Sequence, residues 1–80
     1  MEITVNSHGS TKVVNIPLAV ESDTVFLVET VLRRLIAEET RNIVCNFTQT
    51  EIVSEAGLAM FIAVLKDLHR LQGQMVFCLL

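Results

Sequence analysis

Residues 43–65 read IVCNFTQTEIVSEAGLAMFIAVL, and this stretch decides the fold. It opens with a short apolar run, residues 43–47, which predicts a buried strand. Polar residues and a second apolar pair then lead into Ser54, after which apolar residues recur at helical spacing. Because serine is preferred at the N-cap of a helix, we expect a helix to begin there. Its first turn carries Glu55 beside backbone N–H groups that favour negative charge, so this helix start is a candidate switch or docking point.

The N-terminal half of the chain predicts a hairpin and an earlier helix. Residues 1–5 and 12–16 have strand-like patterns and flank a Ser-His-Gly-Ser turn, which favours an antiparallel pair. Apolar residues at helical spacing from 24 to about 39 predict the helix. Either Ser22 or Asp23 is expected to cap its N-terminus.

The C-terminal half completes an α/β domain. The helix that begins at Ser54 is expected to run to about residue 71, with Gly73 in the left-handed conformation after its end. Residues 75–80 are uniformly apolar and predict a fourth strand. The order strand–strand–helix–strand–helix–strand predicts a four-stranded mixed sheet. Since crossovers between parallel strands are right-handed, both helices are expected to pack on one face, which leaves the other face without a helix.

The second predicted helix has an unusual outward side near its start. Its first two turns carry small or apolar residues there, where charged residues are usual. Such a surface suits close approach by another protein, and it equally suits a helix end covered by a neighbouring loop. The outward residues are Ala59, Ile62 and Ala63. The residues expected on the buried face are Leu58, Phe61, Val64, Leu65, Leu68 and Leu71.

The composition limits the classes of function. Eighty residues form one domain, 1–80, because a chain of this length has room for a single core. A hydrophobic fraction of 51% and a mean hydropathy of +0.54 indicate an apolar core and an apolar surface that meets a partner. A net charge of −3 with six scattered basic residues argues against nucleic acid. With no signal sequence and no apolar run of about 20 residues, we expect a cytosolic protein without direct membrane insertion.

Residues that usually carry catalysis or bind metals are few and scattered. His8 and His69 stand far from each other and from cysteine in the sequence, which argues against a metal site. Cys45 and Cys78 each lie in an apolar run, where buried thiols are expected, although neighbouring runs would also permit a bond. The sequence has no glycine-rich phosphate loop, no evident nucleophile beside a base and no paired acids suited to acid–base work. It therefore predicts neither an enzyme nor a cofactor.

The element order and three sequence segments resemble the STAS domain, the family of bacterial anti-sigma factor antagonists and related modules. The segments are NIVCNF at 42–47, IVSEAGL at 52–58 and LQGQMVFC at 71–78, and the resemblance covers nearly the whole chain. It implies a regulatory role through protein–protein contacts in signal transduction and transcription. Relatives continue past the last strand with further helical structure, and commonly with another strand. The apolar surface near residue 80 is therefore expected to be covered by a second copy, by a partner or by further chain.

The resemblance also identifies a departure from the family signature. That signature is typically Asp-Ser-Ser-Gly-Leu, and a partner kinase phosphorylates its first serine. Aligned on Gly57, this sequence places Ser54 at the aspartate and Glu55 at the phosphoacceptor. Ala56 takes the place of the second serine. A carboxylate brings about one negative charge where phosphoserine brings about 1.5 to 2. Glu55 is therefore expected to imitate the phosphorylated state partially and permanently, without kinase control at this position.

Ser54 keeps a hydroxyl one residue before the phosphoacceptor position. As a helix cap its oxygen would be engaged with backbone N–H groups, and as a phosphorylation site it would replace the lost serine. The sequence leaves both interpretations open and favours the role of Ser54 as a helix cap.

Three functions fit the sequence and the resemblance. The first is a module that binds an anti-sigma factor or another serine kinase-like protein. The second is a STAS subunit that docks on the ATPase of a lipid-transport system, which needs no phosphorylation. The third is a scaffold subunit of a larger signalling assembly. The residues expected to bind the partner are Ser54, Glu55, Ala56, Gly57, Leu58, Ala59, Ile62 and Ala63.

Overall fold

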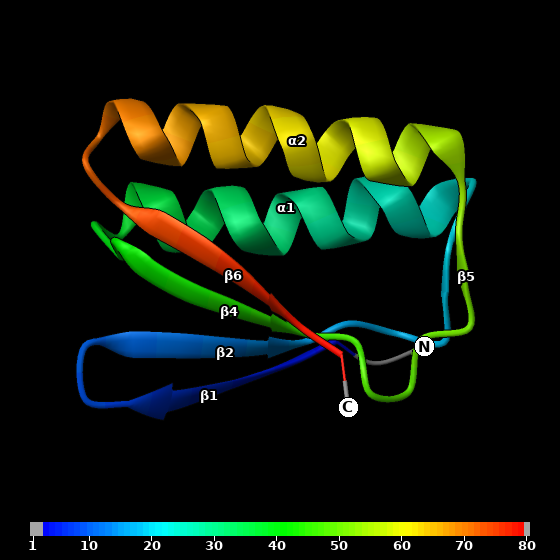
Figure 1. Ribbon diagram of the computed structural model, residues 1–80, viewed down its shortest axis with the longest axis horizontal. Coiled ribbons are helices and arrows are strands. Elements are labelled where there is room, and N and C mark those ends of the chain that lie inside the picture. Colours follow the sequence, from blue (N-terminus) through cyan, green and yellow to red (C-terminus); the bar gives the residue numbers. More distant parts are fainter. Residues whose placement is uncertain (1–2, 80) are drawn as a thin grey trace.

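Two layers make up the structure: a four-stranded sheet and a pair of helices that cover one of its faces (Figure 1). The computed structural model describes residues 3–79. Residues 1, 2 and 80, which belong to two of the predicted strands, lie outside the described part. The strands of the main sheet are β1 (Thr4–His8), β2 (Thr11–Asn15), β4 (Asn42–Asn46) and β6 (Gln74–Cys78).

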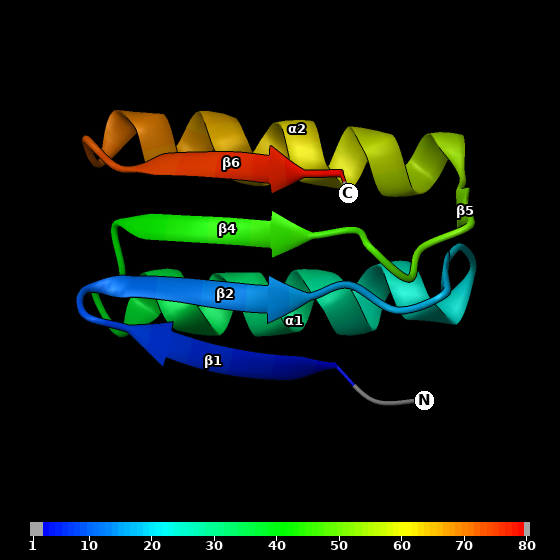
Figure 2. The ribbon, with the colours of Figure 1, turned by 60° about the horizontal axis from the view of Figure 1, so that its bottom comes forward.

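The order of strands in the sheet is β1-β2-β4-β6, as Figure 2 shows from the sheet side. Strand β1 pairs antiparallel with β2, while β2, β4 and β6 are parallel. Helix α1 (Asp23–Ala37) connects β2 to β4, and helix α2 (Glu55–Arg70) connects β4 to β6. Because successive parallel strands add in one direction, crossovers of one hand place both helices on the same face. For residues 3–79, the predicted mixed sheet with one face free of helices is confirmed.

A second, two-stranded sheet was not predicted. Strand β3 (Ala19–Val20) precedes α1, strand β5 (Ile52–Val53) precedes α2, and the two pair in parallel. The amide of Glu51 donates to the carbonyl of Leu18 at 2.8 Å, which extends this pairing by one residue. This small sheet ties the two helix starts together beside the main sheet (Figure 1).

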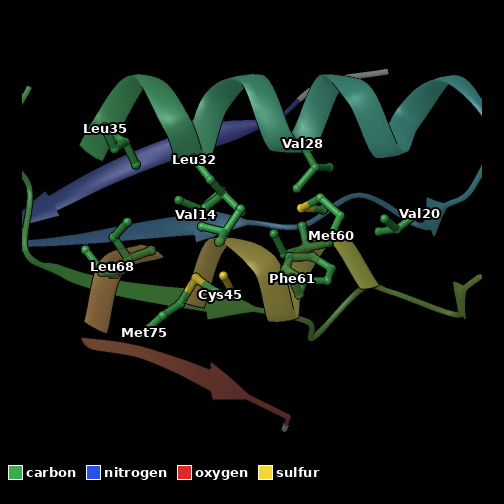
Figure 3. Close-up of a cluster of buried hydrophobic side chains, with 13 residues drawn as sticks. Val14, Val20, Val28, Leu32, Leu35, Cys45, Met60, Phe61, Leu68 and Met75 are labelled. Carbon is green, nitrogen blue, oxygen red and sulfur yellow. The ribbon is translucent and has the colours of Figure 1, made fainter. Parts of the chain in front are cut away.

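The core lies between the helix pair and the sheet, as the close-up in Figure 3 shows. Helix α2 packs against both the sheet and α1, so its buried face is rotated toward α1 and includes Met60. The prediction that Leu58 and Leu71 face the core is wrong, because their side chains are 57% and 45% exposed. The buried apolar residues are Val14, Ile16, Val20, Val28, Leu32, Leu35, Ile43, Cys45, Met60, Phe61, Val64, Leu68 and Met75.

Two predicted helix boundaries need correction. Ser22 occupies the N-cap position of α1, but its side chain makes no capping hydrogen bond. Instead the hydroxyl of Thr24 accepts from the amide of Glu21 at 2.9 Å and donates to the carbonyl of Ala19. After α2 the left-handed residue is Gln72, with φ of 64°, and not Gly73.

One ion pair joins the exposed edges of the two helices. The guanidinium of Arg33 on α1 donates to the carboxylate of Asp67 on α2 at 2.6 Å and also contacts Glu29 at 3.2 Å. The hydrogen bond from Arg33 lowers the pKa of Asp67. Because the pair is exposed to solvent, its contribution to stability is small. It shows that the Asp67 side of α2 faces α1.

Candidate functional site

The start of helix α2 is built as the sequence predicts. Ser54 is its N-cap, with extended backbone angles, and its hydroxyl oxygen accepts a hydrogen bond from the amide of Gly57 at 3.1 Å. The amide of Leu58 donates to the carbonyl of Ser54 at 2.9 Å. The first bond satisfies an amide of the first turn that has no intrahelical partner, and the second is the first backbone hydrogen bond of the helix. The expectation that Ser54 acts as a helix cap is confirmed.

The small sheet fixes the position of this helix start. The amide of Ser54 donates to the carbonyl of Val20 at 2.9 Å, directly after the pairing of Val20 with Val53. Gly57 packs against the same strand, and a Cβ atom there would lie 2.9 Å from the carbonyl oxygen of Val20. Only glycine allows this approach without a shift of backbone. Gly57 is buried, so it positions the helix start and offers no contact surface.

The other predicted residues lie together on the exposed part of α2. Glu55, the first residue of the helix, is exposed, and a carboxylate there is favoured by roughly 0.3–1 kcal/mol through the helix dipole. No described segment covers the outward side of the first two turns, so the alternative of a helix end beneath a loop is wrong. We call this group the signature surface; it consists of Glu55, Ala56, Leu58, Ala59, Ile62 and Ala63.

An apolar pocket beside the signature surface was not predicted. It has a volume of about 240 Å³ and opens between the start of α2 and the end of β6. Three phenylalanine rings form its base, with centroid distances of 5.3 to 5.8 Å. The rings come from α2, from β6 and from the connection after β4, which is why no local pattern indicated the pocket. The lining residues are Phe47, Val53, Leu58, Phe61, Phe77 and Leu79.

A polar cleft of about 310 Å³ lies on the face of the sheet without helices. Asn15 donates to the hydroxyl of Thr4 at 2.8 Å, and Asn46 donates to the side-chain oxygen of Asn15 at 2.9 Å. The amide of Thr48 continues this chain of bonds to Asn46 at 3.0 Å. Because these neutral groups satisfy one another across three strands, we interpret the cleft as part of the sheet's own hydrogen bonding.

The remaining observations concern metal ligands, the two cysteines and the hydropathy of the helices. Within residues 3–79 no three His, Cys, Asp or Glu side chains are grouped so that they could hold a metal ion. Both cysteines are free, and the sheet register places them on opposite faces. Burial raises the pKa of the Cys45 thiol to about 12, which makes it a poor nucleophile. Over the same residues no helix has the length and apolar character needed to cross a bilayer.

Comparison with known proteins gives a family and a fold. The sequence model of the STAS domain matches residues 2–80. Among curated proteins no relative matches. The unphosphorylated anti-sigma factor antagonist SpoIIAA superposes with a TM-score of 0.80 at 13% identity, over 95% of this chain and 71% of that one. The phosphorylated form of SpoIIAA, the Bacillus cell fate determinant, gives 0.77 at 13% identity, over 92% of this chain and 68% of that one.

A third solved structure shows the same fold inside a larger protein. The crystal structure of Mglu superposes with a TM-score of 0.81 at 14% identity, over 92% of this chain but only 18% of that protein. At these identities the likeness concerns the fold alone.

Proposed function

Because this chain belongs to the STAS domain family, we propose that it is a regulatory module that binds another protein through the signature surface. The observation that carries the proposal is the position of Glu55. It is exposed at the first residue of α2, one residue after a serine whose hydroxyl caps the helix. In the family signature that this segment resembles, the same position holds a serine that a kinase modifies.

The chemistry of Glu55 supports a module without a switch at this position. Its side chain has no hydroxyl, so a serine kinase has no acceptor there. Its carboxylate lies where the helix dipole favours negative charge, and it imitates part of the charge of a phosphate. The hydroxyl oxygen of Ser54 accepts a hydrogen bond from an amide of the helix, so this side chain is already engaged as the helix cap. Without a switch at this position, the module binds its partner constitutively or binds a different partner from its relatives.

The surroundings of Glu55 support a protein as the partner. Ala56, Ala59 and Ala63 are exposed and small, so the backbone of another protein can come close to α2. Leu58 and Ile62 are 57% and 45% exposed and supply apolar area at one side of this surface. The proposed partner is an anti-sigma factor or a related serine kinase-like protein. Docking on a transporter ATPase is the second candidate, because a permanent carboxylate needs no kinase.

Affinity capture from the native host tests the surface and identifies the partner. We expect Ala59→Arg to weaken capture at least about 30-fold, because a central contact is worth about 2 kcal/mol or more. The control is Asn6→Arg, which adds the same side chain on the sheet face without helices and should leave capture unchanged. Equal recovery by both variants would show that the partner binds elsewhere. A kinase-like protein among the captured proteins supports the first candidate, and a transporter ATPase supports the second.

A further inference from the structure

Strand β6 presents one side to solvent along its full length. Among residues 3–79 it pairs only with β4, and its other side points away from β1 and β2 (Figure 2). Two hydrogen bonds show which backbone groups face the side of β4. The amide of Gln74 donates to the carbonyl of Arg41 at 2.7 Å, and the amide of Phe47 donates to the carbonyl of Cys78 at 2.9 Å. Because successive residues of a strand direct their backbone groups to opposite sides, those of Met75 and Phe77 point to the open edge.

This edge lacks the features that usually keep edge strands apart. Proteins protect such strands with charges, proline or bulges. The segment 74–79 reads QMVFCL and contains neither charge nor proline. Val76, Phe77 and Leu79 are 51%, 42% and 78% exposed. The opposite edge of the sheet, β1, carries polar residues at most positions.

The apolar edge continues onto α2. Leu58 and Ile62 lie on the side of the helix away from Asp67, and therefore away from α1. The apolar pocket described above joins Leu58 to Phe77 and Leu79. Leu58, Ile62, Phe77 and Leu79 thus form an apolar surface from the strand edge to the side of the helix, and Val76 adjoins it on the face of the sheet without helices. We call it the β6 edge surface; it consists of Leu58, Ile62, Val76, Phe77 and Leu79.

We propose that this surface binds a second copy of the chain, with β6 of each copy paired antiparallel about a two-fold axis at Val76. In this register Met75 lies opposite Phe77 of the second copy, and their outward amides and carbonyls form the hydrogen bonds of the ladder. Val76 lies opposite its own counterpart and extends the apolar row that Val13 and Val44 form across the sheet. The same surface serves both copies, as a two-fold interface requires.

The charges on α2 fit the same symmetry. An antiparallel β6 pair sets the two α2 helices antiparallel, because each helix packs above its own β6 (Figure 2). The acidic first turn with Glu55 then lies toward the basic last turn of the second copy, which carries His69 and Arg70. Each copy has a net charge of −3, but β6 itself carries no charge. No like charges therefore meet where the two β6 strands pair. This complementarity favours a second copy as the occupant.

Self-association and partner binding share Leu58 and Ile62, so the two events compete. The dimer does not depend on the proposed function, because it rests on the open strand edge, the apolar residues beside that edge and the charge pattern of α2. In a variant that cannot dimerise, Leu58 and Ile62 stay exposed and available to the partner.

Sedimentation equilibrium of the native chain and two charged variants tests the dimer. We expect the native chain to show twice the mass of a single chain. Val76→Lys should show the single-chain mass, because two lysines would meet at the axis. The control is Asn6→Lys, which lies in the same cross-strand row on β1 and should remain dimeric. A native monomer at all concentrations, or a dimer that Val76→Lys leaves intact, would overturn the proposal.

Disulfide trapping tests the register itself. A non-hydrogen-bonded antiparallel pair has Cα atoms about 4.5 Å apart, within the range of roughly 4.4–6.8 Å that a disulfide spans. Val76→Cys in a Cys78→Ser background should therefore form a covalent dimer when diamide oxidises the two thiols. Asn6→Cys in the same background should stay monomeric on a non-reducing gel. Cross-linking of the Asn6→Cys variant instead, or of neither variant, would contradict the register.

Discussion

Replacing Gly73 with alanine is expected to destabilise the domain by about 3 kcal/mol or more, because overpacking against backbone is among the larger effects of a single substitution. A Cβ atom at this position would lie 2.6 Å from the carbonyl oxygen of Arg41 and 2.6 Å from a methyl group of Leu68. The same carbonyl accepts the hydrogen bond that begins the pairing of β6 with β4, from the amide of Gln74. The added methyl group must therefore displace the start of β6.

This loss is large relative to the whole free energy of unfolding, which is about 4–12 kcal/mol for a domain of this length. The midpoint of thermal unfolding should fall by about 12–24 °C. Circular dichroism is the suitable probe because the chain has no tryptophan or tyrosine. The control is Gly9→Ala, where no atom lies within 4 Å and only the positive φ of 63° opposes alanine. If Gly73→Ala lowered the midpoint of thermal unfolding no more than Gly9→Ala does, close packing at Gly73 would be contradicted.

Phe61→Ala is expected to cost about 3–5 kcal/mol of unfolding free energy, the usual range for removing a buried aromatic ring. The side chain is 2% exposed and lies against both other rings of the aromatic cluster. Its ring centroid is 5.3 Å from that of Phe47 and 5.8 Å from that of Phe77. Its loss leaves a cavity between α2 and the sheet and removes the base of the apolar pocket.

The matched control is Phe26→Ala, which removes the same ring from a position that is 70% exposed. This change should stay within about 0.5 kcal/mol of the native chain, as surface substitutions usually do. Urea denaturation at one fixed protein concentration gives both values, because a dimer would make stability depend on concentration. Similar losses for the two variants would show that Phe61 is not at the centre of the core.

The main elements of the fold could be predicted because their signals are local. The apolar run at 43–47, the serine cap and the helical spacing of apolar residues each depend on a few neighbouring residues. The handedness of crossovers then fixes the arrangement of the helices. Strands β3 and β5 were missed because two residues each are too few for a period to appear.

The errors concern contacts between distant segments. Leu58 was placed in the core because it falls on the apolar side of α2, but the packing of α2 against α1 rotates the buried face away from it. Gly73 was expected to adopt a left-handed conformation, yet the reason for glycine is the close approach of Arg41. That approach involves a residue 32 positions away (73 − 41), so no local rule indicates it.

The candidate site shows the same division. The position and capping role of Ser54 followed from sequence, whereas the burial of Gly57 and the adjoining apolar pocket required coordinates. The exposure of Glu55 is what connects the site to function. In the proposed function this fixed carboxylate stands where the family signature has a modifiable hydroxyl, and the rest of the proposal follows from that difference.

The most direct test is the intact mass of the chain after incubation with ATP and the serine kinase of its own host. We predict that the native chain gains no phosphate, while Glu55→Ser gains one, located by fragmentation at residue 55. Ser54→Ala should leave the native result unchanged, because that hydroxyl is engaged as the helix cap. Stoichiometric phosphate on Ser54 of the native chain would contradict the account.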